Sequence, residues 1–251
     1  MYLIFDLDDT LLTDDKQISK YTKNILKKCQ SLGHLIVINS ARPYARIKEY
    51  ADMIDADYVI PNGGAEIYNR NELIFKDYIN KDMVNKLLDI FKDNKKVNDI
   101  SIQSDYLYTK NLDFISKNDH ARFNDFSAYF DEDASKFLIT TNDEKLPYKV
   151  AKKFELEITR YLGGNWYRFS TTNKEKGNKN LYKLLNDTNP KSVAFGDDIG
   201  DYEMLRDATI GVAMKNSVSE LLEKISVVTE YSNNEDGCAR YIEELLDNGI
   251  L

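Results

Sequence analysis

Apolar runs of strand length alternate with helical patterns at both ends of this chain, and this alternation constrains its fold more than any other feature. The runs are continuous rather than interrupted by polar residues, as is typical of parallel strands buried on both faces. They comprise Tyr2–Phe5, Leu35–Ile38, Tyr58–Ile60, Ser192–Phe195 and Ile210–Ala213. Strand–helix alternation of this kind predicts an α/β fold with a Rossmann-like, doubly wound parallel sheet.

The middle of the chain breaks this alternation. Between about Asn80 and Ser170, short β-like runs and two helical patterns follow one another without the order seen in the flanking segments. Such a change is typical of a separate α+β module inserted into a parallel core. We therefore expect a core made of residues 1–79 and 171–251, with an inserted α+β domain made of residues 80–170.

Charge and composition exclude several classes of function. The formal net charge is −8 and the pI is about 5.0, so the chain lacks the basic surface of a nucleic-acid binder. No apolar stretch reaches the length of a membrane span, and the first apolar run is too short for a secretory signal. The two cysteines, Cys29 and Cys238, have neither metal-ligand nor redox spacing. We expect a cytoplasmic monomer or homodimer without nucleic-acid or membrane partners.

Two carboxylates follow the first predicted strand directly. Asp6 ends the apolar run, and Asp8 lies two residues further on. Ligands of open α/β sheets bind outside the carboxyl ends of the strands, and a carboxylate placed there is costly unless it binds something. One carboxylate could attack phosphorus and form an acyl phosphate, while the other protonates the leaving alcohol. The alternative is an acidic helix-capping loop with no chemistry.

A second acidic pair lies at the end of a strand near the C-terminus. Asp197 and Asp201 bracket the predicted strand-to-helix turn that begins at Gly196. Mg²⁺ prefers hard oxygen ligands, so these side chains, placed near Asp6, would form a magnesium site. Without a cation, so much negative charge would repel a phosphate. The structural alternative is a pair of acids that favour a helix N-terminus.

A hydroxyl and a lysine complete the set of candidate groups. Ser40 ends the second predicted strand, where its hydroxyl and the following N–H groups could hold phosphate oxygens. Lys176 opens a predicted helix and could neutralise the phosphate, although Lys174 and Lys179 compete for the same role. A plain helix cap for Ser40 and a solvated surface lysine are the alternatives.

In their order along the chain, these groups resemble the motifs of the haloacid dehalogenase superfamily of phosphatases. The first motif is matched by Asp6, Asp8 and Thr10, the second by Ser40 with Arg42, the third by Lys176-Gly177 and the fourth by Gly196, Asp197 and Asp201. The inserted module resembles the large α/β cap of the Cof-type branch, which is rich in sugar-phosphate phosphatases. Asn62-Gly63 and Asn216 match positions usual in that branch, whereas Gly200 replaces its usual Asn.

The resemblance implies a role for each matched residue. Asp6 would be the nucleophile and Asp8 the general acid and base. Mg²⁺ would be held by Asp6, the main-chain carbonyl of Asp8 and Asp197, with Asp201 bound directly or through water. The substrate, a small phosphorylated metabolite such as a sugar phosphate, would be bound by Ser40, Arg42, Asn62, Lys176 and Asn216. The cap would close over the site and select the leaving group.

Two other functions remain open on the sequence. A phosphotransferase or phosphomutase would pass the same aspartyl phosphate to a sugar instead of to water. A non-catalytic, phosphosugar-binding regulatory protein is the other alternative, for which Gly200 is the one hint. Product analysis with a sugar bisphosphate separates transfer from hydrolysis.

Overall fold

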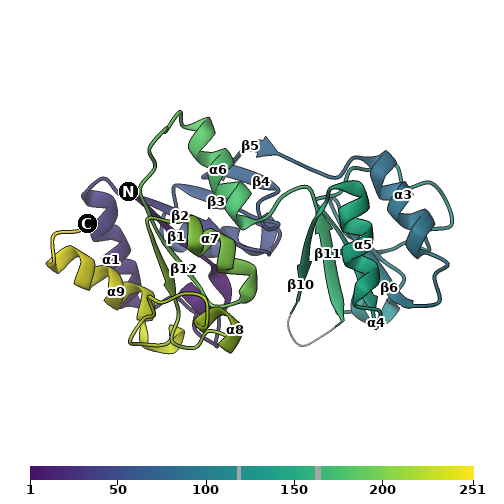
Figure 1. Cartoon of the computed structure of the whole chain (residues 1–251). Coiled ribbons are helices and arrows are strands. Elements are labelled where there is room, and N and C mark those ends of the chain that lie inside the picture. Colours follow the sequence, from purple (N-terminus) through teal and green to yellow (C-terminus); the bar gives the residue numbers. More distant parts are fainter. Residues whose placement is uncertain (118–119, 162–164) are drawn as a thin grey trace. The chain divides into compact units, whose positions relative to one another are not determined.

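The computed structural model of the chain describes residues 1–117, 120–161 and 165–251. The chain forms two compact units. The first unit comprises Met1–Lys76 and Lys174–Leu251, and the second is the inserted segment Asp77–Asn173 (Figure 1). The inserted segment is therefore three residues longer at each end than the expected domain, which ran from residue 80 to residue 170.

The first unit is built on a seven-stranded sheet. Its strand order is β13–β12–β1–β2–β3–β4–β5, in which β13 to β3 are parallel and β4 and β5 form an antiparallel extension. The strands are β1 (Tyr2–Phe5), β2 (Leu35–Asn39), β3 (Tyr58–Ile60), β4 (Glu66–Asn69), β5 (Glu72–Lys76), β12 (Ser192–Gly196) and β13 (Ile210–Ala213). The predicted doubly wound parallel sheet is thus confirmed.

Helices pack on both faces of this sheet, which explains why its parallel strands are mainly apolar and buried. Leu3 and Phe5 of β1 pack in one buried cluster with residues of α1 and α9, whereas Tyr2 and Ile4 pack in another with residues of α6, α7 and α8. The helices of this unit are α1 (Lys20–Ser31), α2 (Lys48–Met53), α6 (Lys174–Leu184), α7 (Tyr202–Asp207), α8 (Ser219–Leu222) and α9 (Gly237–Asp247).

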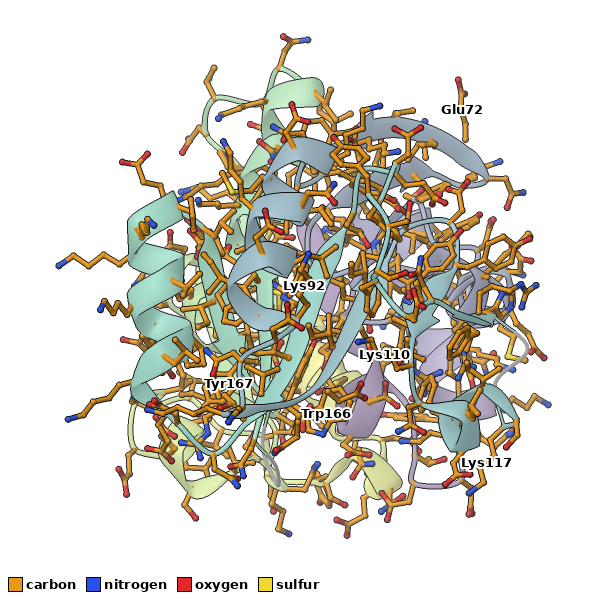
Figure 2. The ribbon with its side chains drawn as sticks, turned by 90° about the vertical axis from the view of Figure 1, so that its right-hand side faces the viewer. Glu72, Lys92, Lys110, Lys117, Trp166 and Tyr167 are labelled. Atoms are coloured by element: carbon orange, nitrogen blue, oxygen red, sulfur yellow. The ribbon has the colours of Figure 1, made fainter. Side chains whose placement is uncertain are left out.

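The inserted unit has a sheet and a core of its own. Its strand order is β10–β11–β9–β6–β7–β8, and every pair is antiparallel except β7 with β8. Apolar residues of α3 and α5 pack against one face of this sheet (Figure 2). The elements are α3 (Lys81–Phe91), β6 (Val97–Gln103), β7 (Leu107–Thr109), α4 (Leu112–Ile115), β8 (Ala121–Phe123), β9 (Lys136–Thr141), α5 (Lys145–Phe154), β10 (Glu157–Arg160) and β11 (Trp166–Ser170).

The helices of both units are short or amphipathic. Within the described residues, none combines the length and the apolar character that crossing a membrane requires.

Candidate active site

Asp6 stands at the carboxyl end of β1, in the middle of the parallel strands. β1 pairs with β12 on one side and with β2 on the other, and the Asp6 N–H donates to the carbonyl of Phe195 at 3.0 Å. The chain then leaves the sheet through an irregular helical turn, Leu7–Leu11. Since the Asp6 residue is only 8% exposed, its carboxylate needs partners within the protein or a bound cation.

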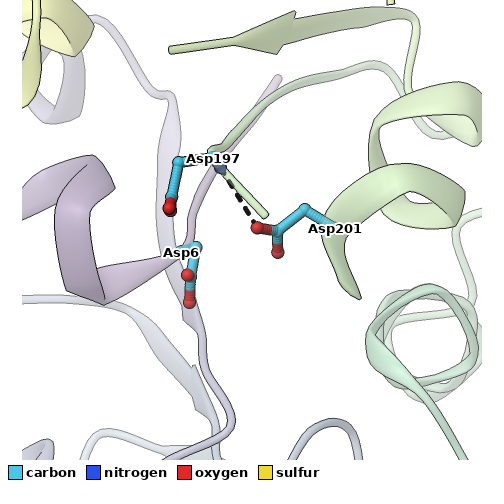
Figure 3. A group of neighbouring side chains, drawn as sticks. All are labelled: Asp6, Asp197 and Asp201. Atoms are coloured by element: carbon cyan, nitrogen blue, oxygen red, sulfur yellow. Dashed lines mark hydrogen bonds between the residues drawn. The ribbon is translucent and has the colours of Figure 1, made fainter. Parts of the chain in front are cut away.

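Three carboxylates meet at this point. Asp6, Asp197 and Asp201 each present an oxygen within 4.8 Å of the others (Figure 3). Burial raises the pKa of Asp6 to about 7, although the ammonium of Lys174 opposes the shift. Burial, together with the charges of Asp6 and Asp201, raises the pKa of Asp197 to about 8. The cluster therefore carries more negative charge than its protein surroundings neutralise.

Asp201 is held by the backbone of the turn that it closes. Its Oδ2 accepts hydrogen bonds from the N–H groups of Asp197 and Asp198, both at 3.2 Å. A Cβ at Gly196 would lie only 2.5 to 2.8 Å from atoms of the Asp201 side chain. Glycine at position 196 therefore allows this carboxylate to fold back beneath the end of β12.

Thr10 orients the remaining acid of the cluster. The Thr10 hydroxyl, which comes from the turn after β1, donates to Oδ1 of Asp197 at 2.7 Å. The motif after the first strand thus contributes both Asp6 and the group that fixes Asp197.

Lys174 is the cation of the site. Its ammonium lies 2.7 Å from Asp6 Oδ1 and 2.5 Å from Asp201 Oδ1, and the residue is buried. Burial opposes its charge, but Asp201 and Asp6 hold the pKa of Lys174 above its ordinary value. The ammonium therefore stays charged beside Asp6.

The lysine that contacts Asp6 is Lys174, whereas the sequence favoured Lys176 as the phosphate-neutralising group. Lys176 is exposed on α6, while Lys174, two residues earlier, reaches Asp6. The reason is the packing of α6 at Gly177, where a Cβ would lie 2.8 Å from Gly64 Cα and 2.9 Å from Ile60 Cγ2. Residues three apart share a helix face, so Lys174 lies on the packed side with Gly177. In the sequence, the start of this helix and the three-residue spacing between Lys174 and Gly177 were the signals that could have identified Lys174.

The second motif is held rigidly by a neighbouring loop. Ser40 follows β2, is buried, and its hydroxyl accepts from the N–H of Arg42 at 3.3 Å. The N–H groups of Asn62 and Gly63 donate to the carbonyls of Arg42 and Ser40, at 2.8 and 2.9 Å. Asn62 has a φ of 52°, a conformation that asparagine tolerates better than most residues. The Asn62–Gly63 loop thus braces the backbone around Ser40.

Arg42 pairs with Asp8. Its Nε and Nη2 donate to the two carboxylate oxygens of Asp8 at 2.6 and 2.5 Å, and Lys16 Nζ lies 3.0 Å from Asp8 Oδ1. Burial opposes the ionised form, but the hydrogen bonds and charges of Arg42 and Lys16 hold the pKa of Asp8 below its ordinary value. Nothing in the sequence pattern indicated the contact between Lys16 and Asp8.

Asn216 has partners that differ from the expected ones. Its side-chain nitrogen donates to the carbonyl of Asp9 at 2.7 Å, and its oxygen accepts from the N–H of Asn233 at 3.0 Å. Because both ends of the amide contact the backbone, Asn216 braces the loop that carries Asp8. These contacts give Asn216 a supporting role in the structure, and its contact with phosphate stays a prediction.

Gly200 lies in the short helical turn Ile199–Asp201 and is exposed. It is not among the residues with positive φ, so the backbone conformation does not require glycine there.

The acidic cluster fits a hard divalent cation. Carboxylate oxygens from Asp6, Asp197 and Asp201 lie close together, and among the residues that the structure describes one ammonium, that of Lys174, contacts Asp6 and Asp201. Mg²⁺ is bound by carboxylates and keeps several waters, which matches this donor set. The buried excess of negative charge is the observation that favours a cation here.

Comparison with known proteins identifies the family. A family model described as haloacid dehalogenase-like hydrolase matches residues 3–242. The chain belongs to this family. The resemblance found in the motifs is thereby confirmed, and so is the expected enzyme class, a phosphatase.

Relatives that are named as phosphatases align over nearly the whole chain. The chain is 29% identical over 262 residues to the 5-amino-6-(5-phospho-D-ribitylamino)uracil phosphatase YitU of Bacillus subtilis, and the alignment covers 97% of both proteins. It is 25% identical to the phosphatase YcsE of the same organism, which carries the same substrate name, over 96% of this chain and 93% of that one.

Solved structures share the fold. The subclass IIB sugar phosphatase BT4131 aligns with a TM-score of 0.81 at 22% identity, covering 100% of this chain and 99% of its own. A haloacid dehalogenase-like hydrolase from B. subtilis aligns with a TM-score of 0.79 at 22% identity, covering 97% and 99%. At this level of identity the likeness concerns the fold alone.

Proposed function

We propose that the protein is a Mg²⁺-dependent phosphomonoesterase that hydrolyses a small phosphorylated metabolite, such as a sugar phosphate, through an aspartyl phosphate on Asp6. The observation that carries the proposal is the buried Asp6 carboxylate, paired with Lys174 and grouped with Asp197 and Asp201 at the strand ends. A carboxylate so placed, with cationic charge on one side, is suited to attack a phosphoryl group.

In the first step, an Asp6 oxygen forms a bond to phosphorus while the bond from phosphorus to the leaving oxygen breaks. In the free enzyme Arg42 and Lys16 favour the ionised form of Asp8, so this step requires Asp8 to gain a proton as the negatively charged phosphate ester binds. Protonated Asp8 then gives this proton to the leaving oxygen, so an alcohol leaves. Lys174 holds positive charge beside Asp6 Oδ1. We assign the binding of a phosphoryl oxygen to the Ser40 hydroxyl, which accepts from the Arg42 N–H through its oxygen and can donate its own proton.

In the second step, water attacks the phosphorus of the aspartyl phosphate. Asp8, now ionised, takes the proton of the water, and the bond between phosphorus and Asp6 breaks to release inorganic phosphate. Mg²⁺, when bound, supplies positive charge that stabilises the transferring phosphoryl group. Asp6 and Asp197 would hold it with the main-chain carbonyl of Asp8. Because Asp201 already accepts from Lys174 and two N–H groups, we assign it a water-mediated role.

The inserted unit Asp77–Asn173 belongs to the same proposal as the cap that selects the leaving group. We also propose that the enzyme acts in the cytoplasm as a monomer or homodimer, which suits its free, buried cysteines Cys29 and Cys238.

A substrate screen tests the function. With Mg²⁺ present, we expect release of inorganic phosphate from sugar phosphates or from phosphorylated ribityl compounds like those named for YitU. Nucleotides and cofactor phosphates serve as comparison substrates. Incubation with a sugar bisphosphate, followed by product analysis, separates hydrolysis from transfer. Phosphate that moves to a second sugar position without release would favour the phosphomutase alternative, and no turnover of any phosphate ester would contradict the proposal.

The two candidate lysines of α6 provide a matched pair of variants. Lys174→Met is expected to lower kcat by about 10²–10³-fold, because it removes the charge beside the attacking carboxylate. Lys176→Met, which removes the same charge from the exposed face of α6, is expected to change kcat by less than about twofold. Steady-state kinetics with p-nitrophenyl phosphate measure both, and thermal melts show whether each variant is folded. The reverse order of effects would restore the assignment to Lys176.

A further inference from the structure

Asp8 is held by two cations that come from different parts of the chain. Arg42, from the loop after β2, contacts both carboxylate oxygens, with Nη2 on Oδ1 and Nε on Oδ2. Lys16, from the loop after the Leu7–Leu11 turn, adds a second contact to Oδ1 at 3.0 Å and also lies 3.3 Å from Asp9 Oδ1. Among the contacts that the structure describes, Oδ1 therefore has two cationic partners and Oδ2 has one.

The backbone around Lys16 is fixed by a closed turn. Thr13 N–H donates to the carbonyl of Gln17, and Lys16 N–H donates to the carbonyl of Thr13, at 3.0 and 2.8 Å. The Thr13 hydroxyl oxygen also accepts from the N–H of Gln17 at 3.1 Å. Lys16 itself has a φ of 58°, a left-handed conformation that glycine or asparagine adopts more readily than lysine. The turn would thus be more relaxed without this side chain, and an unfavourable residue kept in such a place is a reason to look for function.

We infer that Lys16 is a positioning residue that leaves Oδ2 of Asp8 as the oxygen that gives and takes the proton. A carboxylate oxygen accepts about two hydrogen bonds, so Arg42 and Lys16 together saturate Oδ1. Oδ2 keeps one lone pair for the leaving group and, later, for water. Arg42 contacts both oxygens and fixes the plane of the carboxylate, whereas the contact of Lys16, within the described residues, gives Oδ1 one more partner than Oδ2. The inference rests on the proposed role of Asp8 as general acid.

Leaving groups of different basicity provide the test. An alkyl phosphate, such as a hexose 6-phosphate, needs a proton on its departing oxygen, whereas p-nitrophenolate leaves well without one. The ratio kcat/KM reports the steps up to departure of the leaving group. General acid catalysis contributes about 10²–10⁴-fold to the rate. We expect a misplaced acid to lower the rate about tenfold, a part of that contribution. Lys16→Asn, which suits the left-handed turn, should therefore lower kcat/KM about tenfold for the alkyl phosphate and less than about twofold for p-nitrophenyl phosphate.

Three further variants make the result specific. Lys16→Arg should restore most of the alkyl phosphate activity, because it returns a cation to Oδ1. Lys20→Asn removes the same charge from an exposed position four residues away and should leave kcat/KM unchanged for both substrates. Asp8→Asn should show the same selectivity as Lys16→Asn with a larger loss.

The outcomes separate the inference from the proposed function. The inference is overturned if Lys16→Asn lowers kcat/KM equally for both substrates, or for neither, while Asp8→Asn still lowers it mainly for the alkyl phosphate. The role of Asp8 stands in that case. If Asp8→Asn is itself unselective, the general-acid role fails, and the inference fails with it.

Discussion

Asp6→Asn is expected to lower turnover by at least about 10³-fold while leaving the fold intact, since losses of this size follow removal of a covalent nucleophile. The amide has the shape of the carboxylate but cannot form the acyl phosphate. Lys174 keeps its contact with Asp201, so the cation is not left without a partner. Steady-state kinetics with p-nitrophenyl phosphate measure the loss. Asp15→Asn, in an exposed part of the loop after β1, serves as the matched control and should be fully active.

The same variant has a second expected effect, on stability. In the metal-free protein the pKa of Asp6 is raised from 3.8 to about 7, so the folded state binds this proton more tightly than the unfolded state does. Its contribution to the free energy of unfolding is present below about pH 4 and is lost as the pH rises to about 7. In chelator at neutral pH, Asp6→Asn should therefore melt at the same or a higher temperature than the wild type. Substantial retained turnover would rule out the phospho-aspartate mechanism.

Removal of divalent cations is expected to abolish activity, and added Mg²⁺ should restore it. Asp6, Asp197 and Asp201 together outnumber the one ammonium that contacts the cluster within the described residues, that of Lys174. A phosphate ester brings further negative charge to the same place, so without a cation the substrate is repelled. Activity in excess chelator, compared with activity after Mg²⁺ is returned, measures the requirement.

Thermal melts test the metal site without reference to activity. A cation that binds only the folded protein stabilises it by about 2.7 kcal/mol at a concentration one hundred times its Kd. We expect Mg²⁺ to raise the melting temperature of the wild type, and to raise it much less in Asp197→Asn. Glu203→Gln, which removes an acid of α7 outside this cluster, should retain the wild-type response. Full activity in chelator, or an equal Mg²⁺ response in Asp197→Asn, would contradict the assignment.

The parallel core was predictable because its strands are buried on both faces. A strand of this kind appears in the sequence as an unbroken apolar run, and Tyr2–Phe5 was predicted with the bounds that the structure shows. The hairpin of β4 and β5 was not predicted, since its exposed residues give it no continuous apolar pattern. Acids such as Asp6 and Asp197 could be predicted for the same reason, because the apolar runs of these strands end at or next to them.

Residues positioned by packing rather than by the strand pattern were harder to predict. The choice between Lys174 and Lys176 depends on where α6 begins and on its close approach to Gly64, and neither is visible in the motif itself. Asn216 was assigned to the phosphate by analogy, but its amide is used by the backbone of Asp9 and Asn233. The contact of Lys16 with Asp8 depends on a left-handed backbone conformation at Lys16, and a lysine in the sequence does not indicate such a conformation.

The pairing of β1 with β12 has a consequence for how the enzyme is made. Tyr2 lies beside Ser192, so the strand that carries Asp6 meets its partner only after most of the chain has been synthesised. Lys174, Asp197 and Asp201 also belong to the last part of the chain to leave the ribosome. A nascent chain released early would expose one side of β1 as an unpaired edge and would have no active site. Truncated products should therefore be prone to aggregation, and they should not consume phosphorylated metabolites before they are degraded.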